Sequence, residues 1–224
     1  MVRYPNSWEK NLHQLHVLAL PEVVLSEGFW REFVCNLHCG GCCPHFSLDY
    51  LPLEFDILQT AYPNMVGQSM IVEGKTLITL PNEAQKDAYG FDRCQYLDHT
   101  NGSCGIHDWN PLSCQIPLIS IYEVKGRGYI TKRPFARGWN MTPLSGVRGD
   151  ILCEMKAEFS PKQVRENDLI VLARMHEWAK YFEIETHLPE IIRTVREVML
   201  TRNFVRYRFR RSQTPASTKT RSKR

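Results

Sequence analysis

The placement of eight cysteines constrains this chain of 224 residues more than any other feature. Four of them fall within one short stretch, three more follow at equal intervals, and one stands apart. In order they are Cys35, Cys39, Cys42, Cys43, Cys94, Cys104, Cys114 and Cys153. Cysteines that only fill a core would be scattered along the chain. The grouping therefore predicts that thiols from distant stretches converge on a shared metal ion or cluster.

The N-terminal segment does not have the form of a signal peptide, because His13, Gln14 and His16 interrupt its apolar run. No apolar stretch approaches the length that spans a bilayer. We therefore expect a cytoplasmic protein with no membrane partner. In such a reducing compartment, clustered cysteines indicate metal or redox chemistry in place of disulfides.

Thiolates are soft ligands that favour zinc, copper(I) or iron–sulfur clusters. Cys39 and Cys42 have the spacing of a zinc knuckle, but iron–sulfur clusters also take four cysteines, often with two-residue spacings. The adjacent Cys42 and Cys43 are awkward for one tetrahedral ion, since neighbouring side chains point apart. They suit two nearby centres, or one ligand beside a supporting thiol. The spacing leaves the metal and the number of ions open.

Four histidines, His38, His45, His99 and His107, lie near cysteines in the sequence. Histidine can bind zinc, and occasionally an iron–sulfur cluster. We expect these rings to form hydrogen bonds with thiolates or solvent in preference to binding metal directly.

The remaining pattern predicts an α+β fold: a small cysteine-rich metal-binding domain with short strands and loops, followed by a C-terminal helical hairpin. We assign residues 1–34 to an N-terminal helical lead and 35–155 to the metal- or cluster-binding domain. Residues 156–203 form a helical annex of the same domain, and 204–224 a basic, disordered tail. The expected elements are a helix over 52–62, a strand over 76–80, a hairpin over 118–133, and helices from 161 and over 189–199.

The last part of the chain is strongly basic: residues 201–224 contain nine Lys or Arg and no Asp or Glu. Within it, residues 206–211 alternate arginine with tyrosine and phenylalanine. Such a pattern can hold phosphate and stack on bases. We predict a solvated tail, because its end cannot bury enough apolar surface to order itself. Nucleic acid or an acidic protein are its alternative partners.

The motifs around the cysteines also match a known pattern. The first group is followed by Leu48, Pro52, Glu54 and Asp56, and the second lies in the stretches CQYLD (94–98), GSCGIH (102–107) and NPLSCQIP (110–117). Across roughly residues 35–117 this resembles the CxxCxxCC family of zinc- or iron-chelating proteins. That family includes YkgJ-like proteins and the flagellin lysine-N-methylases.

Three departures from the family pattern matter. The first cysteine gap has three residues where the family has two, and Asn110 and Gln115 stand where it usually has arginine. Cys153 lacks the Pro-Gly that usually follows a late cysteine. His107 stands where it often has tyrosine. The resemblance therefore implies metal binding more directly than it implies substrate chemistry.

From these observations we expect a metal-chelating protein that binds an iron–sulfur cluster, with 4Fe–4S favoured over zinc. The ligand pool is Cys35, Cys39, Cys42, Cys43, Cys94, Cys104 and Cys114, with Cys153 as a further candidate. One alternative, which the resemblance suggests, is a protein lysine N-methylase-like enzyme; the other is a zinc-stabilised adaptor that binds nucleic acid. The first three cysteines also have the spacing of radical S-adenosylmethionine enzymes, but Cys43 and the second group fit the other family better. The sequence does not decide whether the protein is an enzyme.

Overall fold

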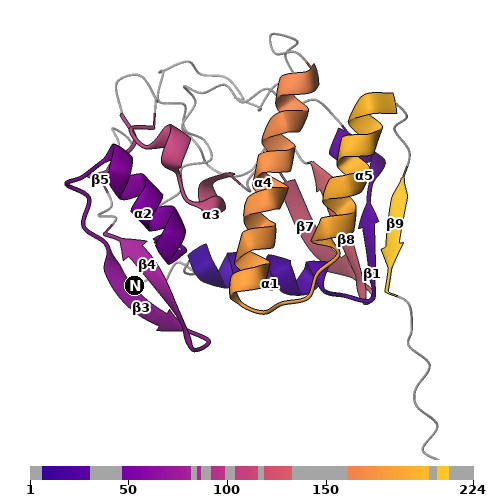
Figure 1. Ribbon diagram of the computed structural model, residues 1–224, viewed down its shortest axis with the longest axis horizontal. Helices are drawn as coiled ribbons and strands as arrows, with labels where there is room; N and C mark the ends of the chain where they lie inside the picture. Colours follow the sequence, from indigo (N-terminus) through magenta and orange to yellow (C-terminus); the bar gives the residue numbers. More distant parts are fainter. Residues whose placement is uncertain are drawn as a thin grey trace, which may run out of the picture.

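The computed structural model describes residues 7–30, 47–81, 85–86, 92–98, 104–115, 119–132, 161–201 and 206–211. These residues form a mixed α+β fold, as the sequence predicts (Figure 1). In chain order the elements are α1 (Ser7–Leu18), β1 (Glu22–Leu25), η1 (Glu27–Trp30), β2 (Leu48–Tyr50), α2 (Pro52–Ala61), β3 (Gln68–Val72), β4 (Lys75–Leu80), β5 (Gln85–Lys86), β6 (Asp92–Arg93), η2 (His107–Trp109), α3 (Leu112–Gln115), β7 (Ile119–Val124), β8 (Arg127–Lys132), α4 (Pro161–Tyr181), α5 (Leu188–Thr201) and β9 (Tyr207–Arg210).

The larger layer is a four-stranded sheet in the order β7-β8-β1-β9, with α1, α4 and α5 over one face (Figure 1). β1 runs parallel to β8 and antiparallel to β9, while β7 and β8 form a hairpin. The hairpin turns at Lys125 and Gly126, whose φ angles of 51° and 75° suit a tight two-residue turn. The side chains on one face of this sheet pack against the helices.

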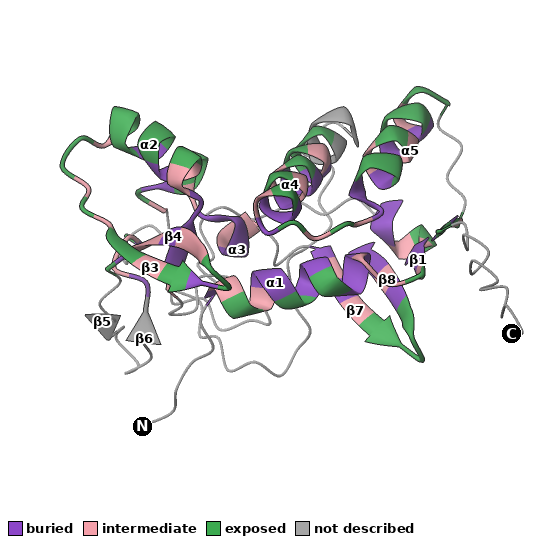
Figure 2. Cartoon of the chain, turned by 60° about the horizontal axis from the view of Figure 1, so that its bottom comes forward, coloured by how far each residue is buried: buried purple, intermediate pink, exposed green. Residues whose placement is uncertain are grey.

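The main core lies between this sheet and the helices. Val23, Leu25 and Ile130 point from the strands into the same buried cluster as Trp178 and Ile191. The buried residues of α4 and α5 lie on the sides of these helices that face α1 and the sheet (Figure 2). None of the helices in the described ranges is long and apolar enough to cross a bilayer.

Gly128 on β8 allows α1 to approach the sheet closely. A Cβ atom at this position would lie 2.6 Å from the carbonyl oxygen of Val17, which is backbone and cannot rotate away. We expect Gly128→Ala to lower the free energy of unfolding by about 2 kcal/mol, the usual cost of overpacking a core. Urea denaturation measures this change. Gly105→Ala is the control, because its nearest contact would be an ordinary 3.4 Å; equal losses in both variants would contradict the argument.

A smaller layer contains the three-stranded sheet β2-β4-β3 and helix α2. Tyr50, Phe55 and Leu58 form its buried cluster together with Leu48 and Leu80. Helix α2 begins with Pro52 at its first turn, and the Glu54 side chain accepts a hydrogen bond from the Leu51 amide at 3.1 Å. The residues that lie beside the cysteine motifs in the sequence belong to this layer.

Asp49, fully buried on β2, joins the smaller layer to α1. Its carboxylate accepts hydrogen bonds from the Ser7 hydroxyl at 2.6 Å and the Trp8 amide at 3.0 Å. The hydroxyls of Ser47 and Thr79 donate to the same group at 2.7 and 2.6 Å. A buried carboxylate is stable only when paired in this way, so Asp49 fixes the start of α1 against the small sheet.

The structure confirms the helix over 52–62, the strand over 76–80, the hairpin over 118–133 and both C-terminal helices. It corrects two other predictions. Val23 and Val24 belong to a strand and not to the helical lead, because α1 ends at Leu18 and the β-branched pair then joins β8. Tyr207–Arg210 is the strand β9 and not part of a disordered tail, because Phe209 is buried against the core while it pairs with β1.

Candidate functional site

Three of the predicted ligands, Cys94, Cys104 and Cys114, lie in the described part of the chain. All three pack against the buried cluster of the smaller layer: Cys94 is buried within it, and Cys104 and Cys114 are partly buried against it. The three residues therefore contact one buried cluster, but their side chains do not form a group that could hold a metal ion. The other candidates lie outside the described residues, namely Cys35, Cys39, Cys42, Cys43, Cys153, His38, His45 and His99.

Backbone hydrogen bonds hold Cys94 and Cys104 on two adjacent segments. Leu97 forms an isolated antiparallel bridge with Cys104, and the Gly105 amide donates to the Tyr96 carbonyl at 2.8 Å. The Leu97 amide also donates to the carbonyl of Cys94 at 3.1 Å. Cysteines that are separated by nine residues in the sequence are thus placed on neighbouring strands of backbone.

Cys114 lies on the short helix α3, where its amide donates to the carbonyl of Pro111 at 2.9 Å. Burial lowers the pKa of the nearby Lys10 ammonium, while the charge of Cys114 acts in the opposite direction. Burial raises the pKa of the Tyr50 phenol well above its usual value, and the charge of Cys114 adds to that rise. Lys10 from α1 and Tyr50 from β2 therefore both lie within electrostatic reach of Cys114.

Arg174 on α4 anchors the loop that leads into α3. Its guanidinium donates to the carbonyl of Asn110 at 2.8 Å and pairs with Glu54 at 2.8–2.9 Å. The same carboxylate accepts a hydrogen bond from the Trp178 indole at 3.1 Å. We call Glu54, Arg174 and Trp178 the strut. It connects α2, α4 and the loop before Cys114, all of which are distant in sequence.

Three buried polar atoms beside Cys114 have no hydrogen-bond partner among the residues that the structure describes: Asn110 Oδ1, Ser113 Oγ and Gln115 Oε1. Buried polar atoms are nearly always paired in folded proteins. A bound group or an ordered water beside Cys114 would satisfy these atoms.

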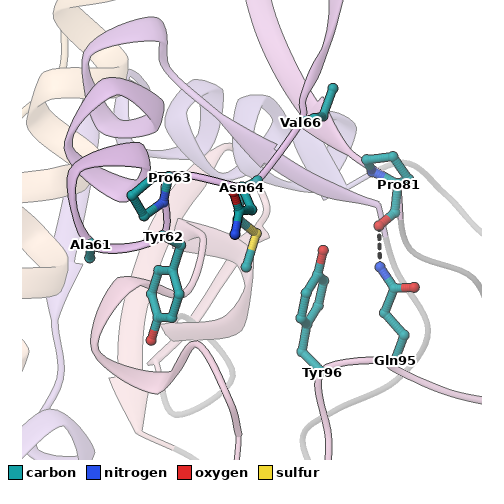
Figure 3. Close-up of a pocket in the computed structure, with 9 residues that line it drawn as sticks. Ala61, Tyr62, Pro63, Asn64, Val66, Pro81, Gln95 and Tyr96 are labelled. Atoms are coloured by element: carbon teal, nitrogen blue, oxygen red, sulfur yellow. Dashed lines mark hydrogen bonds between the residues drawn. The ribbon is translucent and has the colours of Figure 1, made fainter.

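An open cleft of about 530 Å³ adjoins the cysteine segments. Tyr62 and Tyr96 stand on opposite sides of it, and the Gln95 amide donates to the Pro81 carbonyl at its rim (Figure 3). The Tyr62 hydroxyl donates to the carbonyl of Gly105 at 3.0 Å. Gln95 and Tyr96, which follow Cys94 in the sequence, line the cleft, and no cysteine is among its lining residues.

His107, the one described histidine of the four candidates, has a half-exposed side chain. Its Nδ1 atom lies 3.5 Å from the carboxylate of Asp108. The structure thus places this ring at the surface of η2, in contact with its neighbour in the sequence.

The described residues alone do not form a complete metal site. Among them, no three His, Cys, Asp or Glu side chains are arranged to hold a metal ion. Zinc and 4Fe–4S clusters each take four protein ligands in their common sites. The three thiols fit a thiophilic metal by their chemistry and their apolar surroundings. Completion of the site would require cysteines from outside the described ranges.

Sequence reasoning missed Lys10, Tyr50 and Arg174 as neighbours of the cysteine segments. No local pattern marks them, because each comes from a different secondary-structure element and reaches the site only through tertiary packing. Glu54 stands out in the sequence only as part of the motif that follows the first cysteine group.

Comparisons with known proteins identify no relative: no family model, curated protein or solved structure matches this chain.

Proposed function

We propose that this protein binds an iron–sulfur cluster, of the 4Fe–4S type, through its grouped cysteines, with zinc as the alternative metal. The observation that carries the proposal is the packing of Cys94, Cys104 and Cys114 against one buried cluster. The remaining ligands belong to the pool of Cys35, Cys39, Cys42 and Cys43.

The surroundings of Cys114 support the same proposal. Lys10 brings a positive charge toward a region where several thiolates would collect negative charge, whereas the charge of Arg174 is balanced by Glu54 at 2.8 Å. The unpartnered Ser113 hydroxyl could donate a hydrogen bond to a bound centre or its ligands, whereas the Asn110 and Gln115 amide oxygens could only accept one. Hydrogen bonds and charge of this kind tune clusters and orient their ligands.

The chain's own residues would hold and shield the centre. Tyr50, Leu58 and Ile106 form an apolar wall that limits the access of water to the cysteines. When bound, a cluster of this type supplies electron transfer or a cross-link between segments. No contact in the described residues favours the methylase-like alternative, and we do not propose it.

Metal analysis of protein purified without oxygen tests the proposal. We expect iron and acid-labile sulfide in equal amounts per chain, with the broad visible absorption of sulfide-to-iron charge transfer. Stoichiometric zinc in a colourless protein would show that the protein binds zinc, the alternative metal, and not a cluster. Protein that is folded and lacks both iron and zinc would overturn the proposal.

A further inference from the structure

Strand β3 forms one edge of the smaller sheet, and its composition is not that of a protected edge (Figure 1). Natural sheets protect an edge strand with charge, with proline or with a covering segment. Residues 61–72, which include β3, contain no charged side chain, and β3 itself contains no proline. Ser69 is exposed, and Ile71 is 70% exposed, so no segment covers them. This edge therefore has the composition of a strand that can pair with another strand.

The geometry of the β3–β4 hairpin determines which backbone groups face the free edge. The two turn residues, 73–74, have φ angles of 49° and 76°, which suit a two-residue turn. Val72 and Lys75 flank this turn as its hydrogen-bonded pair, and such pairs alternate with non-bonded pairs along an antiparallel ladder. The amides and carbonyls of Ser69 and Ile71 therefore point away from β4, toward the free edge.

Thr76 on β4, the residue paired with Ile71, provides an independent check. Its amide donates a hydrogen bond to the Tyr181 hydroxyl at 3.1 Å, and that hydroxyl donates to the Thr76 carbonyl at 2.6 Å. The backbone groups of Thr76 are thus turned away from β3, so those of Ile71 are turned away from β4. Within the part of the chain that the structure describes, no hydrogen bond satisfies the outward groups of Ser69 or Ile71.

This free edge is complementary to itself. When two copies of β3 run antiparallel with their Met70 residues opposite each other, Ser69 of each copy lies opposite Ile71 of the other. Both residues direct their backbone groups across the seam, and each such pair exchanges two hydrogen bonds. The arrangement has twofold symmetry and closes at two copies. Glu73, the first charged residue after β3, lies opposite the uncharged Gly67 of the other copy, so the two carboxylates stay apart.

We propose that β3 pairs with β3 of a second copy of this chain, which joins the two three-stranded sheets into one continuous sheet. A second copy supplies a strand with the matching direction, backbone pattern and absence of charge. The exposed Ile71 side chain then lies beside a serine, which is small enough to leave it room. The seam is short, so we expect weak association. The proposal goes beyond the metal centre and does not depend on it.

Sedimentation velocity with the full chain, kept reduced and free of oxygen so that no disulfide links two copies, tests this inference. We expect a shift from monomer to dimer as the protein concentration rises from about 1 µM to about 1 mM. A monomer at every concentration would overturn the proposal and leave the edge to a strand of a different protein. Growth beyond a dimer would also contradict it, because the proposed pairing is closed.

Two charge variants test the register of the seam. Ser69→Lys with Ile71→Lys places lysine opposite lysine in both pairs, whereas Ser69→Lys with Ile71→Glu places lysine opposite glutamate. Like charges directly opposite each other destabilise a strand pair, so the first variant should dimerise about tenfold more weakly than the second. Both variants lose the same two exposed side chains and differ only in one charge. Equal affinities would refute this register.

The control for added charge is Leu200→Lys with Thr201→Lys, two exposed positions at the end of α5. It should dimerise like the unmodified protein. Weakening equal to that of the double lysine variant on β3 would show general repulsion and contradict the assignment to this edge.

Hydrogen exchange locates the seam without any substitution. The amides of Ser69 and Ile71 should exchange more slowly as the dimer forms, because each gains a carbonyl partner across the seam. This measurement remains decisive even if a charge variant is poorly folded. Unchanged exchange at both amides in the dimer would place the contact elsewhere and overturn the proposal.

Discussion

Replacement of Cys114 by serine should remove most of the bound metal. The variant removes the thiol that we propose as a ligand, near Lys10 and Tyr50, and serine does not replace it for a thiophilic metal. Because metal binding is coupled to folding, we expect the free energy of unfolding to fall by about 3 kcal/mol or more. That corresponds to roughly 10 °C in Tm for a chain of this length. Metal content per chain and thermal unfolding under oxygen-free conditions measure both effects.

Met65→Leu is the matched control for this variant. Met65 packs against the same buried cluster and lines the cleft, but its sulfur is a thioether. Leucine conserves its volume, so we expect full metal content and a stability loss of less than about 1.5 kcal/mol. Retention of full metal content by Cys114→Ser would remove this residue from the ligand set, whatever its effect on stability.

Replacement of Arg174 by leucine should destabilise the protein by about 3 kcal/mol. The change leaves the partly buried carboxylate of Glu54 without its cation and the Asn110 carbonyl without its donor. Loss of one partner of a buried pair costs more than loss of both. The double variant Glu54→Leu, Arg174→Leu should therefore lose less stability than the sum of the two single variants. Chemical denaturation of the four proteins gives the coupling energy.

The exposed Arg193 provides the reference for this cycle, since Arg193→Leu on α5 should change stability by less than about 0.5 kcal/mol. If Arg174→Leu costs no more free energy of unfolding than this, the strut does not stabilise the fold.

The strut also predicts a local effect: Arg174→Leu should increase the hydrogen-exchange rate of the Cys114 amide, because the loop before α3 loses its anchor.

The elements that the sequence predicted well carry their signals within a few residues. Helix α2 is bounded by Pro52 and Pro63, and the β7–β8 hairpin surrounds a glycine turn. Strands β1 and β9 could not be predicted in this way. Each has four residues, and each becomes a strand through partners that are distant in the chain. The alternation of Tyr207 and Phe209 with arginine was visible, but without a partner strand it fitted a solvated tail equally well.

The sequence marked Cys94, Cys104 and Cys114 as candidates and gave no signal for their neighbours. All three contact one cluster, and their role as ligands stays a prediction. Arg174 could not be foreseen, because it comes from α4 and reaches the carbonyl of Asn110 through space. The resemblance expects arginine at position 110; here a guanidinium from another helix binds the backbone of that residue.

The position of β1 in the large sheet has a consequence for synthesis on the ribosome. β1 ends at Leu25, yet the strands on its two sides begin only at Arg127 and Tyr207. Both edges of β1 therefore stay open while the intervening chain is translated. Pairings this distant form slowly, so the nascent chain exposes the apolar Val23 and Leu25 to chaperones, and to other nascent chains, until β9 emerges.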